Sequence, residues 1–183
     1  MTDPFDNPWS RKPRVIAYDY GGTLAPNSSA DPDGARRDQP VYPEAAEMIR
    51  YLHDAHGILA ILSSNNQPTE PRRPSLETAG LLDYFGAVLL SEDLSCGKPD
   101  PLFYGKLLTA ARQITGGCEP WDVVHVGDNP MTDIAGPIQH GMRAVWVTGD
   151  ANGALDNRHL VAAGAVRVIG NITLLPRELG LDL

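Results

Sequence analysis

The sequence predicts an α/β fold, a Rossmann-like three-layer sandwich in which helices cover both faces of a mainly parallel sheet. Short apolar runs alternate along the chain with stretches of helical periodicity, and glycine or proline separates many of them. Strands that alternate with helices at this spacing form parallel βαβ units. Polar residues directly follow several of the apolar runs, and the carboxyl ends of parallel strands are where such sheets bind ligands.

Six apolar runs have the length of buried strands in this sheet. The run at residues 15–18 ends in Asp19 and a glycine pair, and the run at 58–62 ends in a cluster of serine and asparagine. The other runs lie at residues 87–90, 122–126, 145–147 and 166–169. The sheet is therefore predicted to contain five to six strands, with residues 166–169 as the sixth.

Apolar residues at helical spacing fill the intervals between these strands. One helix is predicted to begin at Pro43, which suits a first helical turn, and to end at Gly57. A second amphipathic helix covers residues 103–114. Shorter helices are predicted at residues 75–79 and 133–140, and a proline interrupts the latter.

The composition is that of a soluble globular domain and argues against several functional classes. Of the 183 residues, 42% are hydrophobic and 21% are charged, and the formal net charge is −8. A negative net charge opposes binding to nucleic acid or to an anionic membrane. No apolar run reaches the roughly 18 residues that span a bilayer, and the first dozen residues lack a signal-peptide core. We expect a cytoplasmic protein without nucleic-acid or membrane partners.

The chain is predicted to form one domain with two less regular segments. Residues 1–13 are polar and proline-rich, which predicts a flexible N-terminal segment ahead of a core domain at residues 14–183. Residues 25–40 are rich in Pro, Asp, Ser, Gly and Arg and show no hydrophobic periodicity. They are predicted to form an exposed loop, of the length at which loops begin to be functional or disordered.

Polar residues at the ends of three predicted strands indicate a binding site. Asp19, Ser63 and Asp128 each follow such a strand, and the carboxyl ends of parallel strands meet at one edge of a sheet. Lys98, in a loop that opens a helix, can join them. Two carboxylates, a hydroxyl and an ammonium suit a divalent cation and a phosphate, and hard oxygen ligands favour Mg²⁺.

The order of these residues resembles the haloacid dehalogenase-like hydrolase superfamily. The first motif is DYGGTL, which begins at Asp19, and the second is the Ser63 that follows ILAIL. The third contains Lys98 in GKPDP, and the fourth is GDNPMTD at residues 127–133. Short Gly/Asp strings recur by chance, so each motif alone is weak. Four motifs in this order, each at a predicted strand or helix boundary, identify the chain as a member of the superfamily.

The resemblance implies an Mg²⁺-dependent phosphohydrolase, that is, a phosphatase. Asp19 would be the nucleophile, attacking phosphorus in line to form an aspartyl-phosphate. Lys98 and the metal would offset the repulsion between this carboxylate and the phosphoryl group. The metal ligands implied are Asp19, the backbone carbonyl of Gly21, and Asp128, with Asp133 close by or acting through water.

The resemblance also implies a set of phosphate-binding groups around Asp19. The hydroxyl of Ser63, with Ser64 beside it, and the backbone amides of the glycine pair would donate to phosphoryl oxygens. Glycine permits this close approach of the backbone. The phosphate-binding residues implied are Gly21, Gly22, Ser63, Ser64 and Lys98.

Gly21 departs from the superfamily pattern. Phosphatases of this superfamily usually carry a second aspartate there, which protonates the leaving group and then activates water. Glycine retains the backbone carbonyl that binds metal but has no side chain for general acid–base catalysis, a contribution of roughly 10²–10⁴-fold. The sequence therefore predicts binding of Mg²⁺ and phosphate with a weak capacity to expel an alkoxide.

Three interpretations of Gly21 remain open from the sequence. The substrate has a good leaving group, such as an acyl, enol or aryl phosphate, or supplies its own acid. Alternatively, Asp31, Asp33, Asp38 or a partner subunit replaces the missing acid. In the third interpretation the chain is a binding or regulatory relative with little turnover.

The sequence leaves no room for a cap domain of the usual size between its motifs. An uncapped site admits large ligands, so the predicted partner is a phosphorylated small molecule or an exposed phosphate on a larger substrate. A neighbouring subunit of a homo-oligomer can also supply a lid. Two arginine pairs in loops could form a basic rim, Arg36 with Arg37 and Arg72 with Arg73, although such pairs are more often solvated.

Overall fold

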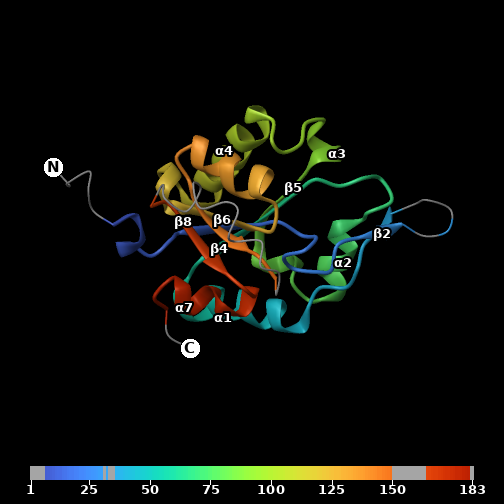
Figure 1. Cartoon of the computed structure of the whole chain (residues 1–183), viewed down its shortest axis with the longest axis horizontal. Helices are drawn as coiled ribbons and strands as arrows, with labels where there is room; N and C mark the ends of the chain where they lie inside the picture. Colours follow the sequence, from blue (N-terminus) through green and yellow to red (C-terminus); the bar gives the residue numbers. More distant parts are fainter. Residues whose placement is uncertain (1–6, 31, 33–35, 150–163, 182–183) are drawn as a thin grey trace.

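Six parallel strands form the central sheet of this computed structural model, which describes residues 7–30, 32, 36–149 and 164–181 (Figure 1). The strand order is β5-β4-β1-β6-β7-β8, so β1 lies in the interior between β4 and β6. The strands are β1 (Val15–Tyr18), β4 (Leu59–Ser64), β5 (Phe85–Leu90), β6 (Val123–Gly127), β7 (Arg143–Val147) and β8 (Val166–Ile169). The predicted Rossmann-like α/β fold is confirmed.

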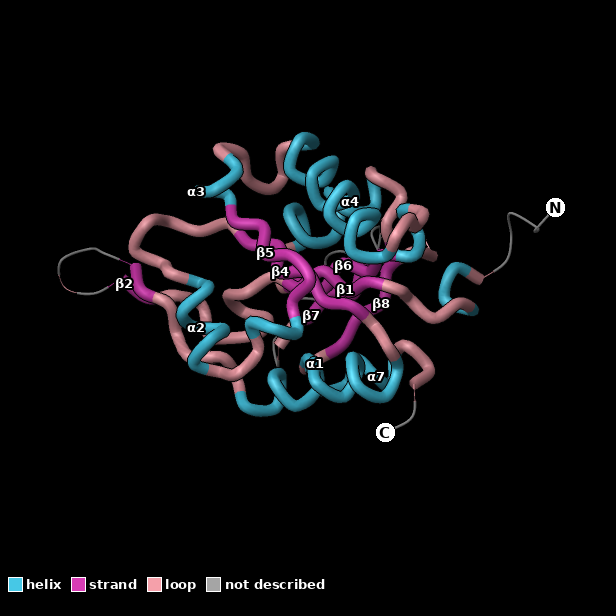
Figure 2. Tube along the Cα trace, turned by 180° about the vertical axis from the view of Figure 1, so that it is seen from behind, coloured by secondary structure: helices cyan, strands magenta, loops and turns pink. Residues whose placement is uncertain are grey.

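Helices cover both faces of this sheet. Helices α1 (Pro43–His56) and α7 (Leu175–Glu178) lie along one face, and α4 (Pro101–Thr115) lies along the other (Figure 2). Alternation within β1 shows how the two cores form, because successive strand residues point to opposite faces. Ile16 packs in the core that contains residues of α1, whereas Ala17 packs in the core that contains residues of α4. Burial on both faces explains why β1 is apolar throughout.

Short elements connect these layers. Helix α5 (Gly136–Gln139) follows a π-helical turn, η4 (Pro130–Ala135). Among the described residues, no helix is long and apolar enough to cross a membrane. The other short helices and turns are η1 (Pro8–Ser10), α2 (Arg72–Thr78), η2 (Leu82–Tyr84), α3 (Ser91–Leu94), η3 (Pro120–Asp122) and η6 (Ile172–Leu174).

Residues 25–40 contain more structure than an irregular loop. Strands β2 (Ser29–Ala30) and β3 (Arg36–Arg37) pair antiparallel within this segment, and β2 lies at the right-hand edge of the molecule in Figure 1. Helix α2 begins at Arg72, three residues before the predicted start at residue 75, and Pro71 is its N-cap residue. Asp38 of this segment contacts Arg72 and Ser75 of α2.

Residues 7–13 are held on the core, which corrects the prediction of a flexible segment for this part of residues 1–13. The buried Arg143 donates from Nη1 to the carbonyl oxygens of Pro8 and Arg11, at 2.9 Å each. The ring of Trp9 lies 5.2 Å from the Arg143 guanidinium, and its indole N–H donates to the Gly164 carbonyl at 3.0 Å. Residues 1–6 lie outside the described part of the chain.

A matched pair of leucine substitutions tests this packing. Leu62 lies in β4 and is fully buried, whereas Leu102 at the start of α4 is 57% exposed. We expect Leu62→Ala to lower the free energy of unfolding by about 2–5 kcal/mol, since it leaves a cavity. Leu102→Ala should change it by no more than about 0.5 kcal/mol. Urea unfolding followed by circular dichroism measures both, and equal losses would contradict the described core.

Candidate active site

Asp19 stands where β1 runs into a tight turn. Its backbone N–H donates to the Val126 carbonyl at 2.9 Å, which continues the contact of β1 with β6 by one residue. The turn then places Gly22 at φ +73°, with its backbone against Asp128. A Cβ atom on Gly22 would lie 2.1 Å from a carboxylate oxygen of Asp128. Only glycine allows this approach, and the approach fixes Asp128 relative to Asp19.

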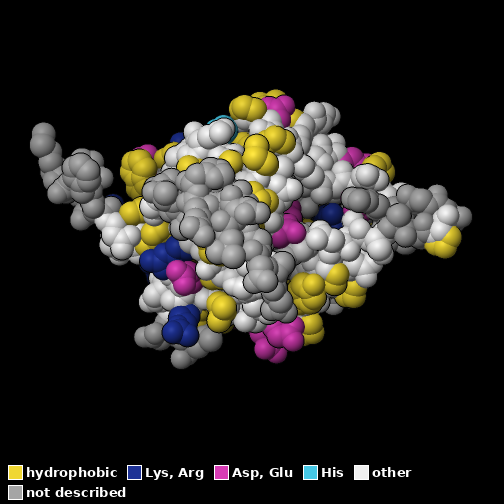
Figure 3. Space-filling view, in the orientation of Figure 1, with side chains coloured by type: hydrophobic (Ala, Val, Ile, Leu, Met, Phe, Trp, Pro, Cys, Tyr) yellow, Lys and Arg dark blue, Asp and Glu magenta, His cyan; other side chains and the backbone are white. Residues whose placement is uncertain are grey.

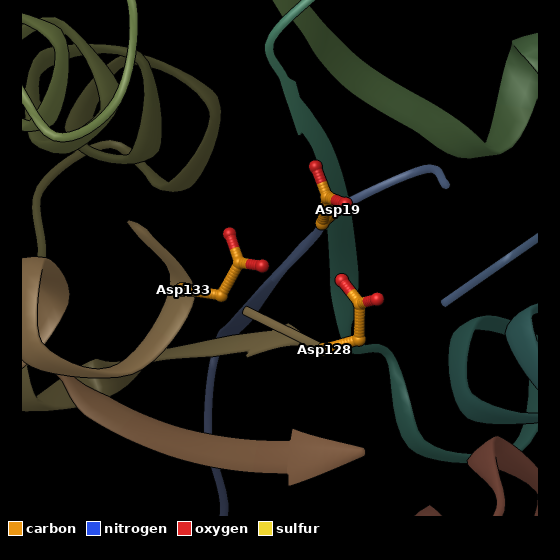
Figure 4. A group of neighbouring side chains, drawn as sticks. All are labelled: Asp19, Asp128 and Asp133. Carbon is orange, nitrogen blue, oxygen red and sulfur yellow. The ribbon is translucent and has the colours of Figure 1, made fainter. Parts of the chain in front are cut away.

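Three aspartates converge at the carboxyl ends of β1 and β6. Carboxylate oxygens of Asp19, Asp128 and Asp133 all lie within 4.8 Å of one another (Figure 4). Asp133 is fixed from η4, because its Oδ2 accepts the N–H of Asn129 at 3.0 Å and its own N–H donates to the Asn129 carbonyl at 2.9 Å. The sequence analysis placed Asp19, Ser63 and Asp128 at one sheet edge, and two of these residues, Asp19 and Asp128, lie together in this cluster.

Lys98 joins two of the three carboxylates. Its Nζ donates to Oδ1 of Asp19 at 2.9 Å and to Oδ1 of Asp133 at 2.6 Å, and the residue is only 5% exposed. Asn65 holds the Lys98 backbone from both sides, accepting its N–H at 2.8 Å and donating to its carbonyl at 2.7 Å. Burial acts to lower the pKa of Lys98, but Asp133 and Asp19 outweigh burial and raise it above its ordinary value.

The aspartates destabilise one another's charges. Burial, followed by the charges of Asp19 and Asp133, raises the pKa of Asp128 to about 6. Burial is also the main reason that the pKa of Asp19 is raised, while the nearby Lys98 acts in the opposite direction. Three carboxylates against one ammonium leave an excess of two negative charges when all are ionised. A divalent cation among these oxygens would relieve that repulsion.

These residues line a polar crevice of about 400 Å³. Predicted residues in its lining are Asp19, Gly21, Ser64, Lys98, Asp128 and Asp133. The lining also includes Arg72, which the sequence analysis offered for a basic rim, and residues that it did not assign to the site, among them Asn27, Ser28, Asn65, Glu70 and Asn129. In the space-filling view, acidic and basic side chains lie close together near the middle of the visible face (Figure 3).

Two predicted phosphate-binding groups are occupied within the fold. The N–H of Gly22 donates to the Ala25 carbonyl at 2.8 Å, inside the turn. The Ser63 hydroxyl is fully buried and hydrogen-bonds Nε2 of His125 at 3.0 Å. Neither residue is in the lining of the crevice, whereas Ser64 is. The Ser64 hydroxyl donates to the Asn65 carbonyl at 3.1 Å, and phosphate binding by Gly22, Ser63 and Ser64 stays a prediction.

His125 is a buried partner that the sequence analysis missed. It lies in β6 beside Ala17 of β1, two residues before Asp19. Burial, with the charge of Lys98 adding to it, lowers the pKa of His125 well below its ordinary value, so the ring is neutral. The only signal in the sequence was a histidine inside an otherwise apolar strand. Its contact with Ser63 joins residues 62 positions apart, and no local sequence pattern predicts it.

The candidate replacement acids and the arginines of the predicted basic rim lie in different places relative to the crevice. Asp31 and Asp33 lie outside the described residues, and Asp38 pairs with Arg72 and with Ser75 rather than lining the crevice. Arg72 is buried in the wall of the crevice, whereas Arg73 pairs with Asp93 at 3.1 Å on the surface. The side chains of Arg36 and Arg37 also lie outside the described part of the structure.

Fold and site together define a Rossmann-like α/β protein with an acidic crevice at the ends of its central strands. The family profile described as haloacid dehalogenase-like hydrolase matches residues 31–141 of this sequence. The chain therefore belongs to the haloacid dehalogenase-like hydrolase family.

Curated relatives include phosphatases of this family. The chain is 38% identical over 112 residues to a phosphoserine phosphatase of Thermus thermophilus, covering 61% of this chain and 42% of that protein. It is 31% identical over 109 residues to the pyrimidine 5′-nucleotidase PynA of Streptococcus pneumoniae, covering 55% of this chain and 44% of that protein. The chain spans less than half the length of these two relatives.

Solved structures share the fold. An uncharacterized protein from Listeria monocytogenes serotype 4b superposes with a TM-score of 0.70 at 20% identity, over 90% of this chain and 96% of that one. A HAD phosphatase from Thermococcus onnurineus superposes with a TM-score of 0.58 at 27% identity, over 78% of this chain and 59% of that one. Both similarities extend over more of the chain than the match to the family profile.

The raised pKa of Asp128 predicts a pH-dependent effect of Asp128→Asn on the metal-free protein. Between the ordinary value of 3.8 and about 6, the folded protein holds a proton that the unfolded chain releases. The stability that this proton contributes is complete below about pH 4 and is lost as the pH rises through about 6. Asparagine cannot ionise, so the variant avoids this loss.

Urea unfolding in excess chelator at several values between about pH 4 and pH 7 measures the effect. The free energy of unfolding of Asp128→Asn relative to the unsubstituted protein should increase across this range. The control is Asp83→Asn, since Asp83 is exposed and lies apart from the crevice. A constant difference for Asp128→Asn would contradict the described repulsion.

Proposed function

We propose that the protein is an Mg²⁺-dependent phosphohydrolase that acts through an aspartyl-phosphate on Asp19. The observation that carries this proposal is the convergence of three carboxylates and one buried ammonium in a single crevice at the strand ends. Family membership supports hydrolysis, and the names of two relatives describe proteins that act on phosphorylated compounds. The acidic cluster favours a metal-assisted phosphatase over a dehalogenase, because halide displacement by a carboxylate needs no cation.

The donor set fits Mg²⁺. The candidate ligands are all oxygens, and their mutual repulsion, seen in the raised pKa of Asp128, is what a divalent cation would remove. The residues that would hold the ion are Asp19, the carbonyl of Gly21, Asp128 and Asp133. When bound, the ion would neutralise carboxylate charge and polarise phosphoryl oxygens.

The chain's own groups then have separate tasks. A carboxylate oxygen of Asp19 attacks phosphorus, and the bond from phosphorus to the leaving-group oxygen breaks. Lys98 holds the Asp19 carboxylate through its 2.9 Å hydrogen bond and places a positive charge beside the incoming phosphoryl group. Ser64, which lines the crevice, supplies a hydroxyl for a phosphoryl oxygen. Water then hydrolyses the aspartyl-phosphate and regenerates the carboxylate.

Gly21 determines which substrates this site suits. A Cβ atom on Gly21 would lie 3.0 Å from Oδ1 of Asn27, so the Asn27 side chain occupies the space of the missing aspartate. An amide cannot donate a proton to an alkoxide as a carboxylic acid does. We therefore assign acyl, enol or aryl phosphates as the substrate class, because their leaving groups depart without protonation. The same feature favours a binding or regulatory role as the second candidate function.

The partner we propose is a phosphorylated small molecule or an exposed phosphate on a larger molecule. The described crevice is open to solvent, since Asn27 in its lining is exposed. A homo-oligomer that supplies a lid and a cytoplasmic location both stay predictions.

The first test of this function is release of inorganic phosphate from acetyl phosphate and p-nitrophenyl phosphate. Activity should require Mg²⁺ and should disappear on chelation. Asp19→Asn should lower kcat by at least about 10³-fold, because the amide is not a nucleophile. Asp83→Asn, the same substitution at an exposed aspartate outside the lining of the crevice, serves as the control. Turnover that survives Asp19→Asn or excess chelator would refute the mechanism, and binding without turnover would favour the second candidate.

Restoring the missing carboxylate gives a second test. Gly21→Asp needs the Asn27 side chain to move by a few tenths of an ångström, and Gly21 does not have the positive φ that would strain another residue. We expect the substitution to raise kcat for alkyl phosphates by up to about 10²-fold and to change kcat for acetyl phosphate little. Gly21→Asn has the same shape without an acidic proton and is the matched control. Equal effects of the two variants would show that the missing acid does not limit turnover.

A further inference from the structure

A hydroxyl–carboxylate pair, Ser28 and Glu70, lines the same crevice as Asp19 and has no part in the mechanism above. The Ser28 hydroxyl donates directly to Oε1 of Glu70. Ser28 lies in the segment that follows β1 and Glu70 lies just before α2, 42 positions further along the chain. The contact therefore fixes the chain at Ser28 to the wall of the crevice, and both partners line the crevice.

Glu70 is built into the wall as a carboxylate. It is only 4% exposed, and its Oε2 accepts the backbone N–H of Gln67 at 2.8 Å. Nη2 of Arg72 lies 3.6 Å from Oε1. These partners, like the Ser28 hydroxyl, are donors, and an ionised carboxylate is an acceptor that needs donors. The Ser28 hydroxyl already donates to this carboxyl group, so Glu70 is placed to accept the Ser28 proton.

Arg72 does not depend on Glu70 for its charge balance. Its Nη1 contacts Oδ1 of Asp38 directly, and its guanidinium lies 4.4 Å from the centre of the Tyr20 ring. Glu70 is the more distant of its two carboxylates. Glu70 can therefore take up a proton without leaving a buried guanidinium unpaired, which is the costly case for a buried ion pair.

Elimination singles out Glu70 among the described residues of the crevice. Asp19 is the proposed nucleophile, and Asp128 and Asp133 belong to the proposed metal site. Lys98 is paired with two of these carboxylates, and an arginine stays protonated. Glu70 is then the described carboxylate in the lining that is left to accept a proton.

We infer that Ser28 and Glu70 activate the water that hydrolyses the aspartyl-phosphate, an inference that rests on the proposed function. The water oxygen forms a bond to phosphorus, and the bond from phosphorus to the Asp19 oxygen breaks with its electron pair returning to the carboxylate. The water proton passes to the Ser28 oxygen as the Ser28 proton passes to Glu70. Ser28 touches the water, and Glu70 acts through it. Phosphate leaves, and Glu70 returns its proton to solvent.

This assignment separates the two chemical steps. Glu70 accepts hydrogen bonds from Ser28 and Gln67, so the relay carries protons away from the crevice and gives none to a leaving group, and phosphoryl transfer to Asp19 proceeds without acid. Hydrolysis of the intermediate does have a proton acceptor. The site is then suited to turn over acyl and aryl phosphates completely, rather than stopping at the phosphorylated aspartate.

The test measures the aspartyl-phosphate itself. The protein is mixed with acetyl phosphate and Mg²⁺, quenched in acid, and the fraction phosphorylated on Asp19 is determined by mass spectrometry after proteolysis. Decay is then followed after the acetyl phosphate is diluted away. We expect Ser28→Ala and Glu70→Gln to slow this decay by about 10²-fold and to raise the phosphorylated fraction at steady state. The rate at which the intermediate forms should change little.

Two control variants separate chemistry from folding. Ser28→Thr keeps the hydroxyl and should restore decay to within a few-fold of the unsubstituted protein. Ser75→Ala removes a hydroxyl that donates to Asp38 in the neighbouring ion cluster, outside the lining of the crevice, and should leave decay unchanged. If the Ser28 contact were purely structural, Ser28→Ala would lower the rates of formation and decay of the intermediate together. Ser28→Thr would then not restore the decay rate selectively.

Each outcome decides something. A phosphorylated Asp19 that decays equally fast in Ser28→Ala, Glu70→Gln and the unsubstituted protein overturns the relay and leaves the proposed function intact. Phosphate release without any phosphorylated Asp19 in any variant overturns the proposed function. Slower decay in both variants, with rescue by Ser28→Thr, supports the relay.

Discussion

The ammonium of Lys98 between Asp19 and Asp133 is the interaction on which the site depends. It joins the end of β1 to the turn that follows β6, and the Asn65 side chain fixes its backbone from the end of β4. Without this charge, burial would favour protonation of Asp19, and a protonated carboxyl is a poor nucleophile. Lys98 opposes the burial that raises the pKa of Asp19, but one ammonium cannot balance three carboxylates, so the arrangement also creates the demand for a divalent cation.

The residues that could be predicted from the sequence are those placed by the backbone alone. Asp19 and Asp128 end apolar runs, and the ends of parallel strands share one sheet edge, so their convergence follows from topology. Topology does not determine in the same way the side of the sheet to which a side chain at a strand end points. Ser63 and Ser64 differ by one position and therefore point to opposite sides. Both serines are buried, but Ser64 lines the crevice, whereas Ser63 hydrogen-bonds His125 of β6, two strands away in the sheet.

Tertiary contacts between distant segments account for the rest of what the sequence left open. Residues 25–40 had no periodicity, and their composition indicated only exposure. In the structure their described part supplies Asn27 over Gly21, Ser28 to Glu70 and Asp38 to Arg72. Each of these contacts joins polar residues whose types are common in solvated loops. No local pattern distinguishes a loop that is anchored by such contacts from one that is not.

In the proposed mechanism, a site that lacks an acid for the first step would gain substrate selectivity from that lack. For an alkyl phosphate, transfer to Asp19 would require expulsion of an alkoxide, and the Asn27 amide beside Gly21 gives it no proton. For an acyl or aryl phosphate the leaving group departs unaided, and the limiting barrier moves to hydrolysis of the aspartyl-phosphate. That is the step at which a proton acceptor matters, and a buried carboxylate with a hydroxyl directed at it is present in the crevice. The glycine at position 21 and the Ser28–Glu70 pair are therefore consistent with one another: the glycine limits the first step to activated phosphates, and the pair would serve the second step, which is the same for every substrate.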